Sequence, residues 1–215
     1  MSEATTIFGC SFGPGGWHHI RTTLQEYDAK PGIAFRETTL YRYLKSFQPM
    51  SICDLIEPSP FQCRLPLFVY PWGTFRRDGI EQSKSPWGSR FCGPSSDEFI
   101  AQEFERIVCL YQALRQSGYK PWSYGNGFIQ GVFLYSLNGE RRFIVLQGNH
   151  RLAILAHLGA QRVWVRSCPG NVISVREADL DRWPLVIDGS CDRETARKIF
   201  ALYFEETGTH ILSRI

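Results

Sequence analysis

The sequence predicts an α+β fold, in which a small mixed β-sheet packs with helices and is extended by helical additions at both ends of the chain. Three patterns lead to this prediction: a strand–glycine–helix unit over residues 143–159, a long amphipathic helix before it, and a β-hairpin signal between the two. With 215 residues, of which 43% are hydrophobic and 21% charged, the chain can bury a substantial core.

The strand–glycine–helix unit is the sharpest chemical signal in the chain. Residues 143–146 form a short apolar run that is typical of a buried strand, and Gly148 interrupts it. From Asn149 onward the apolar positions follow a helical period. The turn therefore presents Asn149, His150 and Arg151 at a helix N-terminus, where unpaired N–H groups and the helix dipole favour an anion such as phosphate.

A helix and a hairpin precede this unit. Residues 95–98 (Ser-Ser-Asp-Glu) provide capping side chains and an acidic first turn, and Gly118 suits the end of the helix. The helix carries an amphipathic stripe at four- and three-residue spacing: Ile100, Phe104, Ile107, Tyr111 and Leu114. Residues 128–137 and 141–146 then predict two strands, which the Asn-Gly turn at 138–139 joins into a hairpin.

The chain divides into three expected regions that form one compact unit. Residues 1–70 are an N-terminal helical extension, residues 71–175 are the core, and residues 176–215 are a C-terminal helical addition. Further strands are expected at 163–165 and 172–175.

Within the N-terminal region, residues 1–16 are small, polar and glycine-rich, and we expect a loosely packed lead-in there. Residues 38–56 show a helical pattern, and residues 65–70 suit a strand. His18 and His19 could ligate a metal, but adjacent residues do not face one way and no acidic or cysteine partner stands nearby, so we favour a structural role. In the C-terminal region, Asp192 is expected to cap a last helix.

Residues 71–96 form a long irregular stretch that contains the triplet Pro-Trp-Gly twice. A loop of this length is usually functional, and its aromatic and arginine residues argue against disorder. A loop that covers a substrate and a plain surface loop both remain open. In the first case, Arg76, Arg77 and Arg90 are the candidate anion contacts.

Composition narrows the class of protein. A net charge of +3 with no basic run makes nucleic acid an unexpected partner. Neither a signal-peptide pattern nor an apolar stretch of membrane-spanning length is present, so we expect a cytoplasmic protein. Seven scattered cysteines without a Cys-x-x-Cys pair predict reduced thiols rather than zinc ligands or a disulfide framework.

The order of elements over residues 97–166 and the segment Gly148-Asn149-His150-Arg151-Leu152-Ala153 resemble the ParB/sulfiredoxin superfamily. There, a segment of the type Asp-Gly-His-His-Arg or Gly-Glu-Arg-Arg opens a helix that ends in Leu-Gly and precedes a short strand of valines. Three further segments match here: Leu158-Gly159, Val163-Trp164-Val165 and the link Gly118-Tyr119-Lys120-Pro121 after the first helix. The resemblance spans a third of the chain and implies a ParB/sulfiredoxin-like core.

Branches of that superfamily differ in chemistry, so the fold does not settle the function. Sulfiredoxin-like enzymes carry a cysteine before the His-Arg pair, and Asn149 at that position excludes thiol repair. ParB partition proteins bind CTP and DNA and need a helix-turn-helix domain, and no such domain or basic stripe is found. The chain is most similar to free serine kinases, which transfer a nucleotide phosphate to a small hydroxyl compound.

The resemblance thus implies a kinase of a sugar, polyol or amino acid that uses Mg²⁺ and ATP or another nucleoside di- or triphosphate. The N–H groups of residues 148–150 (Gly148, Asn149 and His150) would cradle phosphate. Arg151 would bind phosphate oxygens, and His150 would contact the transferred group or order the turn.

The general base is the open question, because Gln147 stands where such kinases carry an acidic residue, and glutamine cannot accept the proton. Asp97 and Glu98 are the candidate bases and magnesium ligands, with Asp78 and Glu140 as weaker choices. A plain role as helix-start charges is the favoured alternative for Asp97 and Glu98.

A second hypothesis is a non-catalytic nucleotide-binding or regulatory ParB-like module with a DNA or protein partner. Gln147 favours this module, whereas the arginine-bearing loop and the missing DNA-binding domain favour the kinase. The layout of the chain also looks similar to proteins of bacterial surface-polysaccharide gene clusters, which points toward a sugar-like acceptor.

Overall fold

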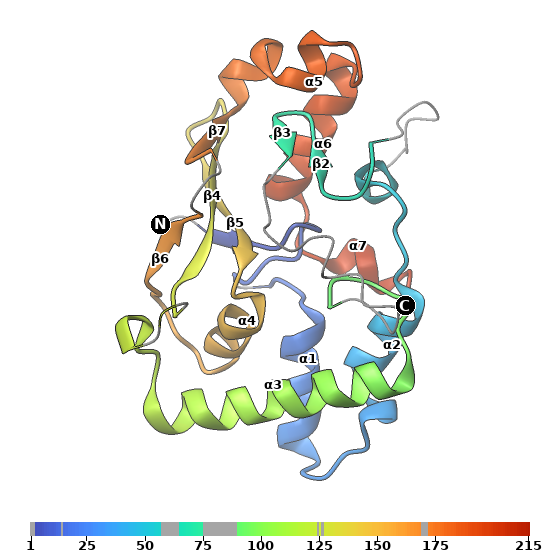
Figure 1. Cartoon of the computed structure of the whole chain (residues 1–215), viewed down its shortest axis with the longest axis vertical. Coiled ribbons are helices and arrows are strands. Elements are labelled where there is room, and N and C mark those ends of the chain that lie inside the picture. Colours follow the sequence, from blue (N-terminus) through green and yellow to red (C-terminus); the bar gives the residue numbers. More distant parts are fainter. Residues whose placement is uncertain are drawn as a thin grey trace.

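The computed structural model describes residues 3–13, 15–56, 65–74, 90–123, 125, 127–168 and 172–215 (Figure 1). The fold is α+β with a small mixed sheet, as predicted. The described strands are β1 (Glu3–Thr5), β2 (Val69–Tyr70), β3 (Gly73–Thr74), β4 (Ile129–Tyr135), β5 (Arg141–Gln147), β6 (Val165–Ser167) and β7 (Ser174–Arg176).

Helices surround the sheet. The described α-helices are α1 (His19–Ala29), α2 (Thr39–Ser46), α3 (Asp97–Ser117), α4 (Asn149–His157), α5 (Pro184–Ile187), α6 (Arg193–Glu205) and α7 (Thr209–Leu212). The described 3-10 helices are η1 (Phe35–Glu37), η2 (Ile52–Leu55), η4 (Pro121–Ser123) and η5 (Glu177–Arg182). None of the helices in the described part of the chain has the length and apolar character needed to cross a membrane.

The main sheet is built around the antiparallel hairpin β4–β5, which confirms the predicted hairpin. The strand order is β1-β5-β4-β6, and β1 runs parallel to β5. Two short strands share the other edge of β4: β6 pairs in parallel with its first half and β7 with its second half. Both begin two residues later than the sequence predicts, at Val165 and Ser174, because short strands lack a clear apolar boundary.

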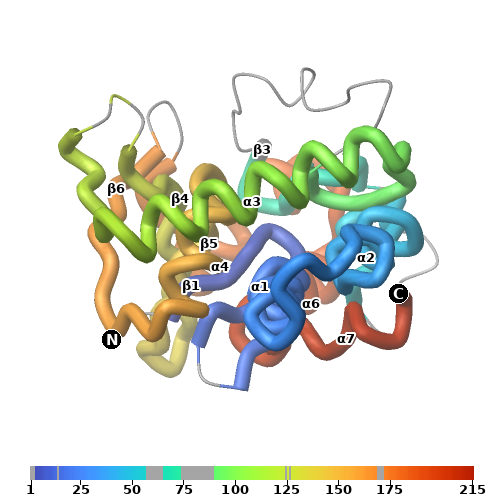
Figure 2. Tube along the Cα trace, turned by 90° about the horizontal axis from the view of Figure 1, so that it is seen from below, coloured from blue at the N-terminus to red at the C-terminus, as the bar shows by residue number. Residues whose placement is uncertain are grey.

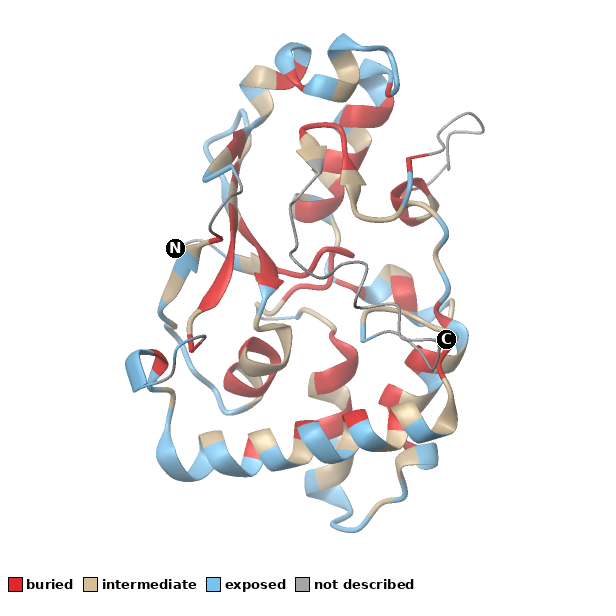
Figure 3. Ribbon diagram, in the orientation of Figure 1, coloured by how far each residue is buried: buried red, intermediate tan, exposed pale blue. Residues whose placement is uncertain are grey.

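Alternate side chains of the hairpin point to opposite faces of the sheet, and each face carries its own hydrophobic cluster. Val132 and Leu134 face the larger cluster, which also receives α1, α2 and α6. Ile129 faces a smaller cluster that α4 covers with Leu152 and Leu155. Figure 3 shows the buried residues concentrated along the hairpin and on the inward sides of the helices.

The predicted long helix is confirmed as α3, whose Ser96 cap accepts a hydrogen bond from the N–H of Phe99. Figure 2 shows α3 running across most of the width of the molecule. Three helices are joined at one carboxylate: Asp28 of α1 accepts hydrogen bonds from Tyr111 of α3 at 3.0 Å and lies 2.8 Å from His157 of α4. This junction holds α4 between α3 and the sheet (Figure 1).

The first residues of the chain are better ordered than the sequence predicts. Instead of a loosely packed lead-in, residues 3–5 form β1, and Ile7, Phe8 and Cys10 are buried. Helix α1 was also not predicted. Both were missed because their apolar residues are few and separated by polar or glycine positions, so no period is visible locally.

Among the described cysteines, five form no disulfide, as predicted: Cys10, Cys92, Cys109, Cys168 and Cys191. Cys53, in contrast, is disulfide-bonded. The prediction of reduced thiols throughout is therefore wrong at Cys53. Spacing along a sequence cannot show which cysteines approach each other in space.

The hairpin provides a matched test of the packing. Leu134 is fully buried and Leu137, three residues along, is 71% exposed. We expect Leu134→Ala to lower the free energy of unfolding by about 2–5 kcal/mol, because the truncation leaves a cavity. Leu137→Ala should change it by less than about 0.5 kcal/mol. Urea denaturation measures both, and equal losses would contradict the placement of β4.

Candidate functional site

The site is built on the turn between β5 and α4, where β5 ends at Gln147 and Gly148 links it to the helix. Gly148 has a φ of +90°, and a Cβ at this position would lie 3.1 Å from the Ile129 side chain. Only glycine fits this conformation and this space without strain. The turn therefore begins α4 at Asn149, as the sequence predicts.

His150, in the first turn of α4, lies against a carboxylate that the sequence analysis did not identify. Its Nε2 is 2.8 Å from Oε1 of Glu103 on α3, close but not ideally aligned for a hydrogen bond. The Glu103 side chain is only 5% exposed. Such a contact fixes the orientation of an imidazole ring.

Two arginines complete the surroundings of Glu103. Its Oε2 is 3.3 Å from Nε of Arg90 and 3.5 Å from Nη1 of Arg106. Burial alone would raise the pKa of Glu103. The short contact with His150 and the positive charges of Arg106 and Arg90 outweigh burial and lower the pKa of Glu103. Glu103 thus remains an ionised, buried carboxylate.

Glu103 could have been found in the sequence. It lies three residues after Ile100 and four before Ile107, on the face of α3 that is buried. A carboxylate within an apolar stripe requires cationic partners. The predicted stripe used Phe104 in place of Glu103, and Phe104 is only partly buried.

Asn149 and Arg151 complete the turn. The Arg151 guanidinium donates a hydrogen bond to the carbonyl of Gly127, which joins the turn to the segment before β4. Burial is the main cause that lowers the pKa of Arg151, although an arginine stays charged at any ordinary pH. Oδ1 of Asn149 is buried without a hydrogen-bond partner among the described residues.

His18 and His19 lie close enough to His150 for its charge to affect them. Both are buried, and their rings form a continuous stack: Phe12–His18 at 4.7 Å, His18–His19 at 4.4 Å and His19–Tyr43 at 3.8 Å between centroids. Nδ1 of His18 caps α1 by accepting the N–H of Ile20. Burial lowers the pKa of His18 to about 3 and that of His19 well below its ordinary value, so both rings are neutral.

The predicted acidic residues lie elsewhere. Asp97 is held by Lys45 at 2.6 Å and Arg36 at 2.7 Å, and the hydrogen bonds from Lys45 and Arg36 lower its pKa. Asp97 is six residues before Glu103, about 9 Å along the helix. Glu98 is exposed. Asp97 is therefore a weak candidate for a base, and Asp97 with Glu98 does not form a fitting magnesium site.

The remaining candidates are only partly placed. Of the predicted loop contacts, Arg90 reaches Glu103, whereas Arg76, Arg77 and Asp78 lie outside the described residues. Glu140 is exposed at the hairpin turn. No three His, Cys, Asp or Glu side chains in the described ranges are arranged to hold a metal ion.

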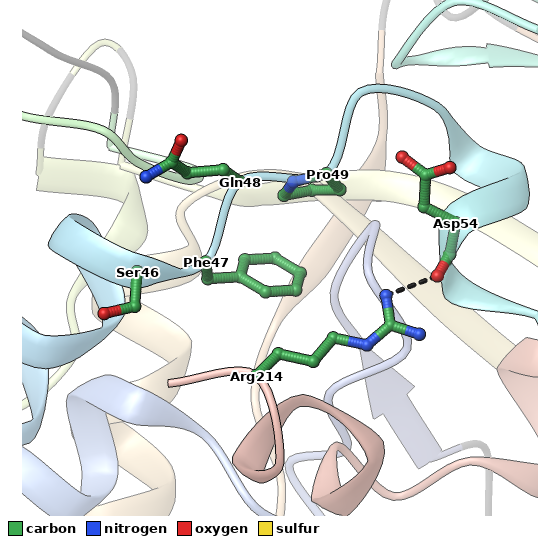
Figure 4. A pocket seen from close by; sticks show the side chains of 6 residues that line it. All are labelled: Ser46, Phe47, Gln48, Pro49, Asp54 and Arg214. Atoms are coloured by element: carbon green, nitrogen blue, oxygen red, sulfur yellow. Dashed lines mark hydrogen bonds between the residues drawn. The ribbon is translucent and has the colours of Figure 1, made fainter.

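A pocket of about 230 Å³ lies away from this site, between the end of α2 and the C-terminal segment (Figure 4). Its wall includes Phe47, Asp54 and Arg214, and the Arg214 guanidinium donates to the backbone carbonyl of Asp54. Neither His150 nor Glu103 lines this pocket.

The fold and the site define an α+β protein that carries a buried carboxylate–histidine pair at a helix N-terminus. Comparison with known proteins adds no relative: no family model matches the chain, and no curated protein or solved structure is significantly similar to it. The geometry of the site is consequently the basis for a functional assignment.

Glu103 should stabilise the fold in a pH-dependent way. We expect Glu103→Gln to lower the free energy of unfolding at pH 7 by about 1–3 kcal/mol, because the cations around residue 103 lose their counter-charge. Since the pKa of Glu103 is below its ordinary value of 4.5, this difference should be complete above pH 4.5 and shrink at lower pH. Urea denaturation from pH 3 to pH 7 tests this, with the exposed Glu105→Gln as control. A difference that does not change with pH would contradict it.

The buried histidines should make the protein acid-sensitive. An unfolded histidine takes up a proton near pH 6.5, whereas His18 in the fold does so only near pH 3. Stability should therefore fall below pH 6.5, by about 1.4 kcal/mol per pH unit for each such ring. His18→Asn retains a capping acceptor and should reduce this slope. Gln25→Asn, at an exposed position of α1, should leave it unchanged. Equal slopes in both variants would refute the assignment.

Proposed function

We propose that the protein is a nucleotide-dependent phosphotransferase with a ParB/sulfiredoxin-like core, acting on the hydroxyl group of a small molecule such as a sugar, polyol or amino acid. The order of elements along the chain supports the proposal: α3, the β4–β5 hairpin, the Gly-x-His-Arg turn, α4 and β6. This is the order that the resemblance to the ParB/sulfiredoxin superfamily implies. The proposed nucleotide substrate is consistent with the cytoplasmic location that we expect for the protein from its sequence.

The contact between His150 and Glu103 carries the proposal. Gln147 cannot act as a base, and Asp97 is occupied by two cations. A carboxylate at Nε2 favours the imidazole tautomer whose proton lies on Nε2, which leaves Nδ1 able to accept a proton. His150 is the general base in this proposal, and Glu103 is its positioning residue.

The phosphate group would lie at the N-terminus of α4. The first N–H groups of a helix have no intrahelical acceptor, and the helix dipole favours negative charge there. Oδ1 of Asn149 is buried without a partner among the described residues at the same place. As an acceptor, it would take a hydrogen bond from a donor group of the ligand, such as the attacking hydroxyl, and not from a phosphate oxygen. Arg151 contributes positive charge beside the turn.

The reaction follows from these positions. The acceptor hydroxyl oxygen attacks the terminal phosphorus of the nucleotide and gives its proton to Nδ1 of His150. The bond between that phosphorus and the bridging oxygen breaks, and its electron pair leaves with the nucleoside diphosphate. Magnesium, which neutralises phosphate charge, would arrive with the nucleotide, because the acidic residues at the start of α3 do not fit a protein-held site.

A non-catalytic nucleotide-binding module, with a DNA or protein partner, is the second candidate. The counter-charge that Glu103 provides favours it, because His150 then needs no external anion. The hydrogen bond of Arg151 to Gly127 favours it too, since that bond has a structural role. Turnover separates the two candidates.

Nucleotide binding tests the phosphate position. We expect ATP, ADP, CTP or GTP with Mg²⁺ to raise the melting temperature of the wild type, and Arg151→Ala to lose this shift because a phosphate contact is removed. Arg197→Ala, at an exposed arginine of α6, is the matched control and should retain it. Equal stabilisation of wild type and Arg151→Ala, or no nucleotide effect at all, would refute the phosphate position.

Turnover tests the base. Nucleotide consumption is measured with a panel of sugars, polyols and amino acids. We expect His150→Gln to lower kcat by about 10²–10⁴-fold while nucleotide stabilisation persists, because general-base catalysis contributes that much. Nucleotide binding without turnover across the panel would support the non-catalytic module instead.

A further inference from the structure

Two tryptophans lie exposed side by side near the turn. Trp122 of η4 is 66% exposed, and Trp164, just before β6, is 64% exposed. Their ring centroids are 5.5 Å apart with the ring planes at 65°. Tryptophan is usually largely buried, and a contiguous exposed apolar patch commonly marks a binding surface.

A phenylalanine and an arginine extend this pair. The Phe128 ring packs edge-on against Trp122 at 5.5 Å, and the guanidinium carbon of Arg166 lies 5.3 Å from the centre of the Phe128 ring. We call Trp122, Phe128, Trp164 and Arg166 the aromatic platform. It lies where the chain leaves α3 and passes η4 beside β6 (Figure 1).

The platform is anchored by its backbone. The Tyr119 hydroxyl accepts the N–H of Ile129 at 3.0 Å and lies within donating distance of the carbonyls of Trp164 and Gly127, at 3.1 and 3.2 Å. A Cβ on Gly127 would lie 2.1 Å from the carbonyl oxygen of Pro121, so η4 and the segment before β4 touch directly. A rigid surface loses little entropy when a ligand binds.

The platform and the α4 turn share a backbone segment. The carbonyl of Gly127, next to Phe128, also accepts the hydrogen bond from Arg151. Ile129, the residue after Phe128, packs closely against Gly148 in the turn. The turn and the platform are therefore neighbours that are joined through residues 127–129.

The charge near the platform favours an anionic ligand. Residues 118–131 and 160–168 contain Lys120, Arg162 and Arg166 but no aspartate or glutamate. A neutral sugar ring would also stack on indoles, but the acidic side chains that commonly bind its hydroxyls are absent from these two stretches. A flat aromatic ring attached to phosphates fits both the rings and the charges.

We propose that the aromatic platform binds the base of the nucleotide whose phosphates lie at the α4 turn. This inference rests on the proposed nucleotide-binding function and adds the base-binding part of the same site. The base stacks on the exposed face of Trp164 or Trp122, and Arg166 supplies positive charge beside it.

Binding assays that compare a whole nucleotide with its nucleoside part and its phosphate part test the platform. Calorimetry measures the affinity of the whole chain for ATP, CTP and GTP, for the corresponding nucleosides, and for inorganic triphosphate. We expect Trp122→Ala and Trp164→Ala each to weaken nucleotide and nucleoside binding about 5-fold or more, and Trp164→Phe to retain most of it. Triphosphate affinity should not change. Leu137→Ala, also highly exposed, is the control.

The outcomes separate the platform from the phosphate turn. Unchanged nucleotide affinity in both tryptophan variants, with loss in Arg151→Ala, overturns the platform and leaves the proposed function intact. Tryptophan-dependent nucleoside binding without triphosphate binding supports the platform and overturns the phosphate turn. No binding of nucleotide or nucleoside to the wild type overturns the platform. Tryptophan-dependent binding of an oligosaccharide, but not of nucleosides, overturns it in favour of a sugar surface.

Discussion

A buried carboxylate constrains how the helices of this protein can be arranged. The Glu103 side chain is buried on the inward face of α3, and a buried carboxylate stays ionised only if positive groups surround it. The partners of Glu103 come from three places in the sequence: the guanidinium groups of Arg90 before α3 and of Arg106 on α3, and the imidazole of His150 on α4. The contact therefore fixes the start of α4 against α3. Apolar packing alone would allow α4 to slide, because it has no direction.

The same constraint gives the α4 turn its chemical character. Two neutral histidines lie beside His150, and they add aromatic packing without adding charge. On the other side, Arg151 and Tyr119 connect the turn with the exposed indoles through Gly127. Charged, neutral and aromatic groups thus surround the end of β5. Hydrophobic clusters, in contrast, cover both faces of the main sheet.

Local patterns predicted the elements that are long or end at a marked residue. Helix α3, the β4–β5 hairpin and the turn into α4 are such elements. Contacts between distant residues were not predictable. Asp97 looked like a free acid until Arg36 and Lys45, more than fifty positions earlier, were placed beside it. Glu103 was missed because Phe104, the apolar neighbour, was assigned to the buried stripe in its place, although the spacing of Ile100 and Ile107 fits both positions.

The parallel pairing of β1 with β5 has a consequence for how the chain reaches its fold. Glu3 pairs with Arg142, so the first strand of the sheet cannot dock until the hairpin has formed. On a ribosome, β1 would emerge long before β5, its partner strand, with Ile7 and Phe8 still exposed. Closing so long a loop is slow. Docking of the N-terminal segment is thus expected to be a late folding step, after α3, the hairpin and α4 have assembled from near neighbours.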